Sequence, residues 1–184
     1  MSLFYFYGEF EEEQVVPLLE NLNKTAGDGI IYFTTNGGNP SVAYVLADSL
    51  WRLTKNGRHF KIIFYESVHS AAFLFLTYLQ KIKEELKQTN LREAGDMISW
   101  YFLDTAYGIL HSVTHVTDKE DADIFEKETQ LIEKINNHFV NIHAKKLTKQ
   151  EKLMFKKGQD VVFDAEKLQR LFGGTIIKTL YEKT

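Results

Sequence analysis

The chain has 184 residues, of which 44% are hydrophobic, and it carries 22 lysines and arginines against 25 aspartates and glutamates. This length suits a single domain over residues 1–184 with one substantial core. The net charge of -3 lacks the basic excess that is typical of proteins that bind nucleic acid or anionic membranes, so we expect neither as a partner.

Cysteine does not occur in the sequence, which excludes disulfides, thiolate metal sites and a cysteine nucleophile. The first residues show neither the basic region nor the long apolar run of a secretory signal. The longest apolar run, Ala71–Leu76, is far shorter than the ~20 residues that a membrane span needs. We therefore expect a cytoplasmic protein.

An alternation of strand and helix opens the chain. Runs rich in β-branched and aromatic residues predict strands over 1–7, 29–35 and 59–65. Apolar residues at helical spacing predict helices over 11–24 and 41–55 between them. This order predicts an α/β fold with parallel strands joined by right-handed crossovers. The nearly continuous apolar runs favour strands that are covered on both faces.

The second half of the chain mixes long helices with short strands. In chain order we expect a helix over 70–89, strands over 98–103 and 108–110, helices over 121–143 and 148–157, and a last strand, at a sheet edge, over 174–180. Thr148 followed three residues later by Glu151 is the pattern of a capping box, which predicts where the shorter helix begins.

Two strand-to-helix junctions carry candidate chemistry. After the second strand, Gly37 and Gly38 allow a sharp turn that can point backbone N–H groups at an oxyanion, although a glycine pair there is more often only a turn. After the third strand, Ser70 opens a helix, where N–H donors and the helix dipole favour a nucleophile. On local sequence alone, a plain helix N-cap is the commoner role for such a serine.

The motifs at these junctions and further along resemble those of the Clp protease proteolytic subunit and, more widely, the Clp/crotonase superfamily. Asn36–Gly38 is similar to the family's glycine turn, and Val68–Ala71 to its serine elbow. Gly108–His111 is similar to the strand that carries the histidine, and Gln159–Glu166 to the segment around the aspartate. The resemblance covers nearly the whole chain, from Leu3 to Leu180.

This resemblance implies a ClpP/crotonase-like fold, a repeated ββα/βαβ superhelix with a long protruding oligomerisation helix. It also implies a serine peptidase in which Ser70 is the nucleophile, His111 the base and Asp160 the acid that orients it. The amides of Gly37 and Ala71 would form the oxyanion hole. The expected substrate is a peptide or an unfolded protein, and no cofactor is implied.

Several residues depart from the family pattern. Glu66 replaces the first glycine of the elbow, and His69 replaces a small residue beside the serine, so we expect a narrower and differently charged pocket entrance. The stretch between Ser70 and His111 is longer than in the family, with the insertion expected within 80–96. The family's axial loops and first helix do not precede the first strand, so we expect docking to an unfoldase ATPase to be incomplete.

Two alternatives keep the fold and change the function. A crotonase-like protein would use the same two amides to stabilise an acyl-CoA enolate without a triad, and a silent assembly subunit would use neither. A metal is the least favoured reading, because the histidine pairs His111 and His115, and His138 and His143, lack a carboxylate motif such as H-E-x-x-H.

The predicted helix over 121–143 points to self-association. Its apolar residues cover more than one face, so that one monomer can bury only part of them. They are Ile124, Phe125, Leu131, Ile132, Ile135 and Phe139. In the family the equivalent helix meets its counterpart from a second ring, so the resemblance implies a closed homo-oligomer.

Overall fold

The computed structural model describes residues 1–88, 97–111, 137 and 139–179. Contacts between Cα atoms divide the chain into two compact units, the first formed by Met1–Ile109 with Val162–Thr184 and the second by Leu110–Val161. The single domain over 1–184 stays a prediction.

Strands and helices alternate from β1 to β4 of the first unit, as the sequence predicted for the start of the chain. In chain order the elements are β1 (Ser2–Phe10), α1 (Glu12–Lys24), β2 (Gly29–Gly38), α2 (Pro40–Lys55), β3 (Phe60–His69), α3 (Ala71–Gln88), β4 (Ile98–Leu103), β5 (Tyr107–Leu110), β6 (Val161–Asp164), α6 (Ala165–Phe172) and β7 (Thr175–Ile177). Both β5 and β6 end or begin at the division between the units.

The sheet of the first unit is parallel at every pair whose register is defined. The strands run in the order β1-β2-β3-β4-β7, and β5 pairs with β3 and with β6. This arrangement confirms the predicted α/β class and the predicted edge position of the last strand. Most of the predicted oligomerisation helix, residues 121–136 and 138, lies outside the described residues. Among the described residues, no helix is both long enough and apolar enough to cross a membrane.

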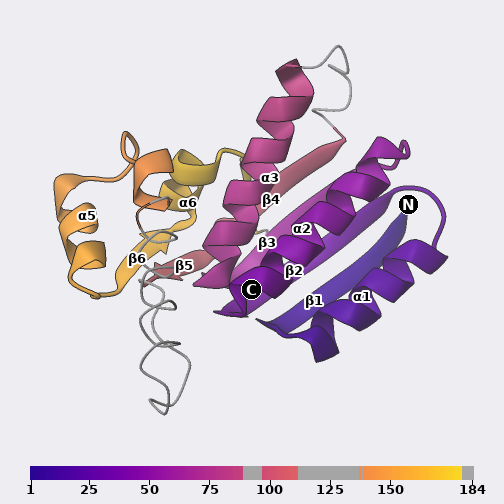
Figure 1. Cartoon of the computed structure of the whole chain (residues 1–184), viewed down its shortest axis with the longest axis horizontal. Helices are drawn as coiled ribbons and strands as arrows, with labels where there is room; N and C mark the ends of the chain where they lie inside the picture. The colour runs from indigo at the N-terminus through magenta and orange to yellow at the C-terminus, as the bar shows by residue number, and fades with distance from the viewer. Residues whose placement is uncertain (89–96, 112–136, 138, 180–184) are drawn as a thin grey trace, which may run out of the picture. The chain divides into compact units, whose positions relative to one another are not determined.

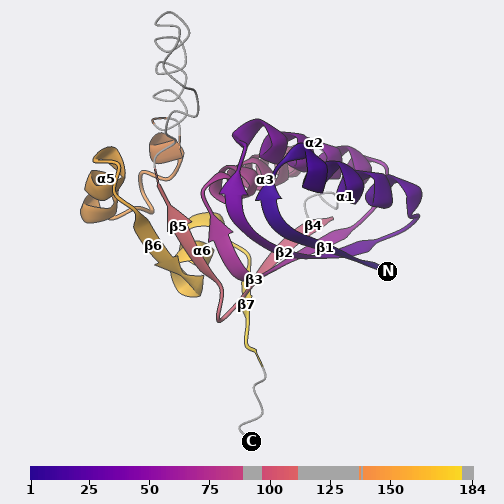
Figure 2. The ribbon, with the colours of Figure 1, turned by 90° about the horizontal axis from the view of Figure 1, so that it is seen from below.

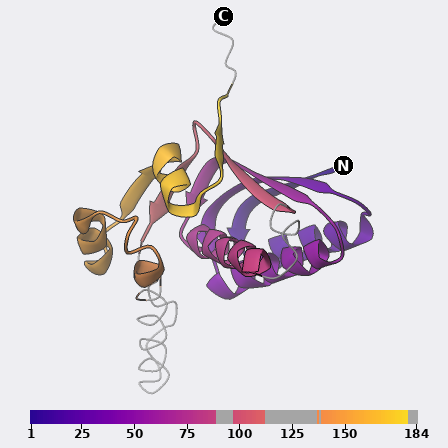
Figure 3. The ribbon, with the colours of Figure 1, turned by 90° about the horizontal axis from the view of Figure 1, so that it is seen from above.

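Helices α1, α2 and α3 cover one face of the sheet (Figures 1 and 2). The view from the opposite side shows the same layering (Figure 3). The other face of β1 is open, since Leu3, Tyr5 and Tyr7 are 57%, 67% and 76% exposed. The expectation that the strands are covered on both faces is therefore wrong for β1, where the continuous apolar run divides by alternation into a buried and an exposed row.

Phenylalanines form the centre of the core beneath the helices. Phe33 of β2 stacks on Phe6 of β1 and on Phe75 of α3, with ring centroids 4.6 and 5.2 Å apart. Phe64 of β3 stacks on Phe102 of β4 at 5.3 Å. Aromatic pairs with this geometry stabilise a core by more than the area they bury, so these pairs hold α3 against the sheet of β1 to β4.

Strand β3 changes its partner along its length. Phe60–Phe64 pairs with β4, whereas Ser67–His69 pairs with β5. On the other side, the register between β2 and β3 shifts between Phe33 and Thr35. The buried hydroxyl of Thr34 fills this irregularity, because it accepts the Ser67 N–H at 3.0 Å and lies 2.9 Å from the Ser67 hydroxyl. This pair fixes the point at which β3 leaves β4.

The second unit is described mainly around α5 (Lys149–Lys156). The predicted capping box is confirmed, since Thr148 accepts the Glu151 N–H at 3.2 Å and Glu151 accepts the Thr148 N–H at 2.7 Å. Next to this helix His143 is 1% exposed, and its ring lies 4.6 Å from that of Phe139. Burial, with a smaller effect from Lys146, lowers the pKa of His143 from 6.5 to about 4.

The buried histidine predicts acid lability. Because the folded-state pKa lies below the unfolded value, His143 binds its proton more tightly after unfolding, and its contribution is intact above pH 6.5 and falls as the pH drops toward 4. We expect the free energy of unfolding, measured with urea, to fall by about 3 kcal/mol over this interval through this residue. His143→Phe should flatten the fall, and parallel pH profiles for the two proteins would contradict the prediction.

Candidate active site

Ser70 lies at the junction between β3 and α3 in an unusual backbone conformation. Its φ of 49° makes it the single non-glycine residue with positive φ in the described part of the chain. The Ser70 N–H donates to the carbonyl of Ile109 in β5 at 3.0 Å, and its carbonyl accepts the Phe73 N–H at 3.0 Å. A helix N-cap normally has extended backbone angles, so Ser70 does not fit that simpler role. Strain of this kind is concentrated at functional sites.

The glycine turn packs directly against Ser70. A Cβ on Gly37 would lie 2.5 Å from the Ser70 Cβ and 3.3 Å from the His69 carbonyl oxygen, and φ is +111° there. A Cβ on Gly38, which also has φ +111°, would lie 2.6 Å from the Phe10 nitrogen. Any side chain is therefore too large at both positions, which is more than an ordinary turn requires. The structure therefore brings Gly37 and Ser70 together, whereas the role of Gly37 in an oxyanion hole, which the resemblance implied, stays a prediction.

The two predicted oxyanion-hole amides differ in their surroundings. Ala71 is the first residue of α3, so its N–H belongs to the turn that has no acceptor within the helix and lies at the positive end of the helix dipole. The Gly37 N–H instead donates to the Thr35 hydroxyl at 3.0 Å. Thr35 is not among the site residues that the sequence predicted. The pattern that could have indicated it is a threonine two residues before a glycine, because at this spacing a side-chain hydroxyl reaches the backbone N–H.

The predicted base and acid belong to the second unit. His111 is half-buried and follows β5, two residues after the Ile109 carbonyl that holds Ser70. Asp160 is exposed and directly precedes β6. The nearby Asp164 has a structural role, because it caps α6 by accepting the Lys167 N–H at 2.8 Å. The assignments of His111 and Asp160 therefore stay predictions.

The two departures at the elbow have separate surroundings. Glu66 is exposed on β3. His69 is half-buried, and its ring meets that of Tyr107 edge-on at 5.1 Å. The contact directs His69 toward β5, so its bulk is accommodated beside the strand that holds the Ser70 N–H.

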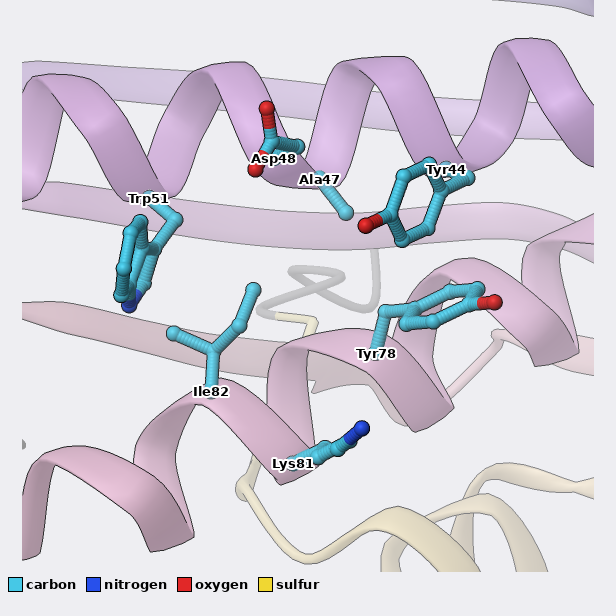
Figure 4. Close-up of a pocket in the computed structure, with 7 residues that line it drawn as sticks. All are labelled: Tyr44, Ala47, Asp48, Trp51, Tyr78, Lys81 and Ile82. Carbon is cyan, nitrogen blue, oxygen red and sulfur yellow. The ribbon is translucent and has the colours of Figure 1, made fainter.

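A hollow of about 220 Å³ is lined by residues of α2 and α3 (Figure 4), and none of these residues belongs to the elbow. Its lining is partly closed by internal contacts, since Tyr44 meets Tyr78 edge-on at 4.5 Å and Asp48 is paired with Arg52 at 2.8 Å. The volume is below the ~300 Å³ at which pockets usually hold a small molecule. No group of three acidic or histidine side chains gathers into a metal site within the described residues.

Comparison with known proteins gives one kind of match. No family model matches the sequence, and neither does any curated protein. Among solved structures, the chain is similar to a variant of ClpP1 from Listeria monocytogenes, with a TM-score of 0.59 and 17% identity over 97% of this chain and 92% of that one. The chain has a ClpP-like fold. This confirms the Clp/crotonase-like architecture predicted from the motifs, and at this identity the likeness concerns the fold alone.

The backbone at Ser70 generates a stability prediction. A left-handed residue costs about 1 kcal/mol unless it is glycine, so Ser70→Gly should be more stable than Ser70→Ala by about that amount in urea unfolding. Ser41, in the first turn of α2, is the matched control, because glycine is unfavourable in a helix and the order of the two variants should reverse. If the alanine variant were the more stable one at residue 70 as well as at residue 41, Ser70 would not be strained.

Proposed function

We propose that this protein is a serine peptidase that hydrolyses peptides or unfolded proteins, with Ser70 as the nucleophile. The observation that carries the proposal is the strained placement of Ser70 at a strand-to-helix junction, in direct contact with Gly37. A nucleophilic serine on such a turn is exposed for attack, with the amide of the next residue and one from a neighbouring loop beside it. The ClpP-like fold supports the proposal.

The chemistry assigns one task to each predicted residue. The Ser70 hydroxyl attacks the scissile carbonyl while His111 takes its proton, and Asp160 holds the imidazole in the required tautomer and stabilises its charged form. The Ala71 and Gly37 amides stabilise the oxyanion. His111 then gives the proton to the leaving amine, which leaves the acyl group bonded to Ser70. Water next attacks this acyl group while His111 takes its proton, and His111 returns the proton to the Ser70 oxygen as the acid product leaves.

Substitution of any one triad residue should nearly abolish peptide hydrolysis. Ser70→Ala, His111→Ala and Asp160→Asn should each lower peptide hydrolysis by at least ~10³, and the double variants should lose little more, because the three residues act as a unit. Hydrolysis of a peptide library and labelling of Ser70 by a fluorophosphonate measure this, with circular dichroism as the control for folding.

The same measurements separate the two alternatives. An assembled protein that binds an acyl-CoA thioester but is not labelled would support the crotonase-like function. One that shows neither thioester binding nor labelling would support a silent assembly subunit. Either result would remove the peptidase proposal.

We also propose that the protein forms a closed homo-oligomer through the predicted helix over 121–143. The expectation rests on the apolar residues of that segment, which exceed what one helix face can bury. Sedimentation velocity at roughly 10–50 μM, a range suited to weak association, should show a species larger than the 21.4 kDa chain. Ile132→Glu should shift it toward the monomer, and a monomeric parent protein would contradict the proposal.

A further inference from the structure

The hydroxyl of Thr34 makes three contacts with a single residue of the neighbouring strand, Ser67. It accepts the Ser67 N–H at 3.0 Å, donates to the Ser67 carbonyl oxygen at 3.3 Å and lies 2.9 Å from the Ser67 hydroxyl. A hydroxyl has one proton and two lone pairs, so these contacts use its whole capacity when the Ser67 hydroxyl donates to Thr34. The two residues are 2% and 8% exposed, so water has little access to this set of bonds.

These contacts lie where β3 contains more residues than β2. At the register shift, Thr34 is the only residue of β2 that lies opposite the stretch 65–67 of β3. The backbone ladder is interrupted at such a bulge, because the extra residues have no backbone partner on the other strand. The Thr34 side chain takes over part of the ladder's role, since it pairs both backbone groups of Ser67.

The length of this bulge determines what the rest of β3 presents. Side chains alternate between the two faces of a strand, so a slip of one residue would turn every later side chain to the opposite face. With Ser67 held in place, β3 pairs with β5 from Ser67 to His69. The next N–H, that of Ser70, donates to the Ile109 carbonyl at 3.0 Å, and the Ser70 side chain lies beside Gly37.

We propose that Thr34 is a positioning residue for the nucleophile: its hydroxyl fixes the register of β3 at Ser67 and thereby the place of the Ser70 hydroxyl. Thr34 acts through Ser67, which lies three residues before the nucleophile in the chain. The inference rests on the proposed function, and it deepens that function by naming a residue on which the reactivity of Ser70 depends.

The expected effect follows from the geometry that nucleophilic attack requires. The reacting atoms must be aligned at about 3–3.5 Å, and a misplacement of about 1 Å by a distant substitution can lower the rate ~10²-fold. Loss of the Thr34 hydroxyl leaves the buried N–H and carbonyl of Ser67 without this partner, which removes a restraint on the end of β3. The attack by Ser70 should therefore slow, while substrate binding changes little.

Substitution of Thr34 tests the role of its hydroxyl. Thr34→Val keeps the shape of the side chain, so kcat for a peptide that the wild type hydrolyses and the fluorophosphonate labelling rate of Ser70 should both fall about 10- to 100-fold, with KM nearly unchanged. Thr34→Ser retains the hydroxyl and should restore both rates to near the wild-type values. If Thr34→Val does not fold, Thr34→Cys replaces it, because a thiol is a weak acceptor and both rates should again fall.

Thr54 supplies the matched control. It is 1% exposed, and its hydroxyl donates to the Leu50 carbonyl within α2 at 2.8 Å. Thr54→Val therefore removes an equally buried hydroxyl without changing β3, and both rates should stay at the wild-type values. Circular dichroism and urea unfolding show how much of each variant is folded, so that a loss of folded protein is not mistaken for a loss of reactivity.

Hydrogen exchange followed by mass spectrometry reports on the strand without reference to activity. Fragments that cover 66–72 should exchange faster in Thr34→Val than in the wild type or Thr34→Ser, because the Ser67 N–H loses its acceptor. Fragments from the start of β2 should be unchanged in all three proteins. There the Gly29 N–H donates to the His59 carbonyl at 2.9 Å, which makes this end of the strand pair the internal reference.

The outcomes separate the inference from the function on which it rests. If the wild type is labelled at Ser70 and Thr34→Val is labelled as fast, the inference fails and the peptidase stands. The inference also fails if Thr34→Ser is as slow as Thr34→Val, if Thr54→Val loses as much, or if exchange at the end of β3 is unchanged. If the wild type is neither labelled nor active, the proposed function fails and the inference falls with it.

Discussion

The change of partner along β3 is the constraint on which the rest of the site depends. A strand that stayed beside β4 to its end would carry Ser70 away from β5. Instead, Thr34 supplies a side-chain acceptor for the Ser67 N–H at the irregularity between β2 and β3, and the last residues of β3 then pair with β5. Buried backbone groups must be paired, and the Thr34 hydroxyl keeps the Ser67 N–H paired where β3 leaves β4. Beyond the last paired residue of β3, the Ser70 N–H donates a hydrogen bond to the Ile109 carbonyl of β5.

Two unusual backbone conformations lie next to each other at the elbow. Ser70 is held in a conformation that serine adopts rarely, and Gly37 and Gly38 adopt one that only glycine adopts readily. A strained residue persists only when the surrounding structure over-determines it. Here the phenylalanine core beneath β2 and β3 and the β5 carbonyl provide that restraint, whereas the Asn36 side of the glycine turn is exposed and less constrained.

The ClpP-like fold determines where the elbow and the glycine turn meet, but an oxyanion hole depends on the direction of single N–H groups. Rotation of one peptide plane changes that direction without moving any element of the fold. The Thr35 hydroxyl is buried near the end of β2 and accepts the Gly37 N–H, which fixes the direction of that amide.

The sequence by itself determined the order of strands and helices, the α/β class and the motifs at the two junctions, because periodicity, β-branched content and glycine pairs are local properties. The resemblance of these motifs to those of the Clp family also implied that Gly37 lies beside Ser70. Only the tertiary structure decided that β1 has an open face, that β3 changes partner at Ser67 and that Thr35 occupies the Gly37 amide. These features depend on pairing between distant residues and on the direction of single bonds, which no local pattern in the chain encodes.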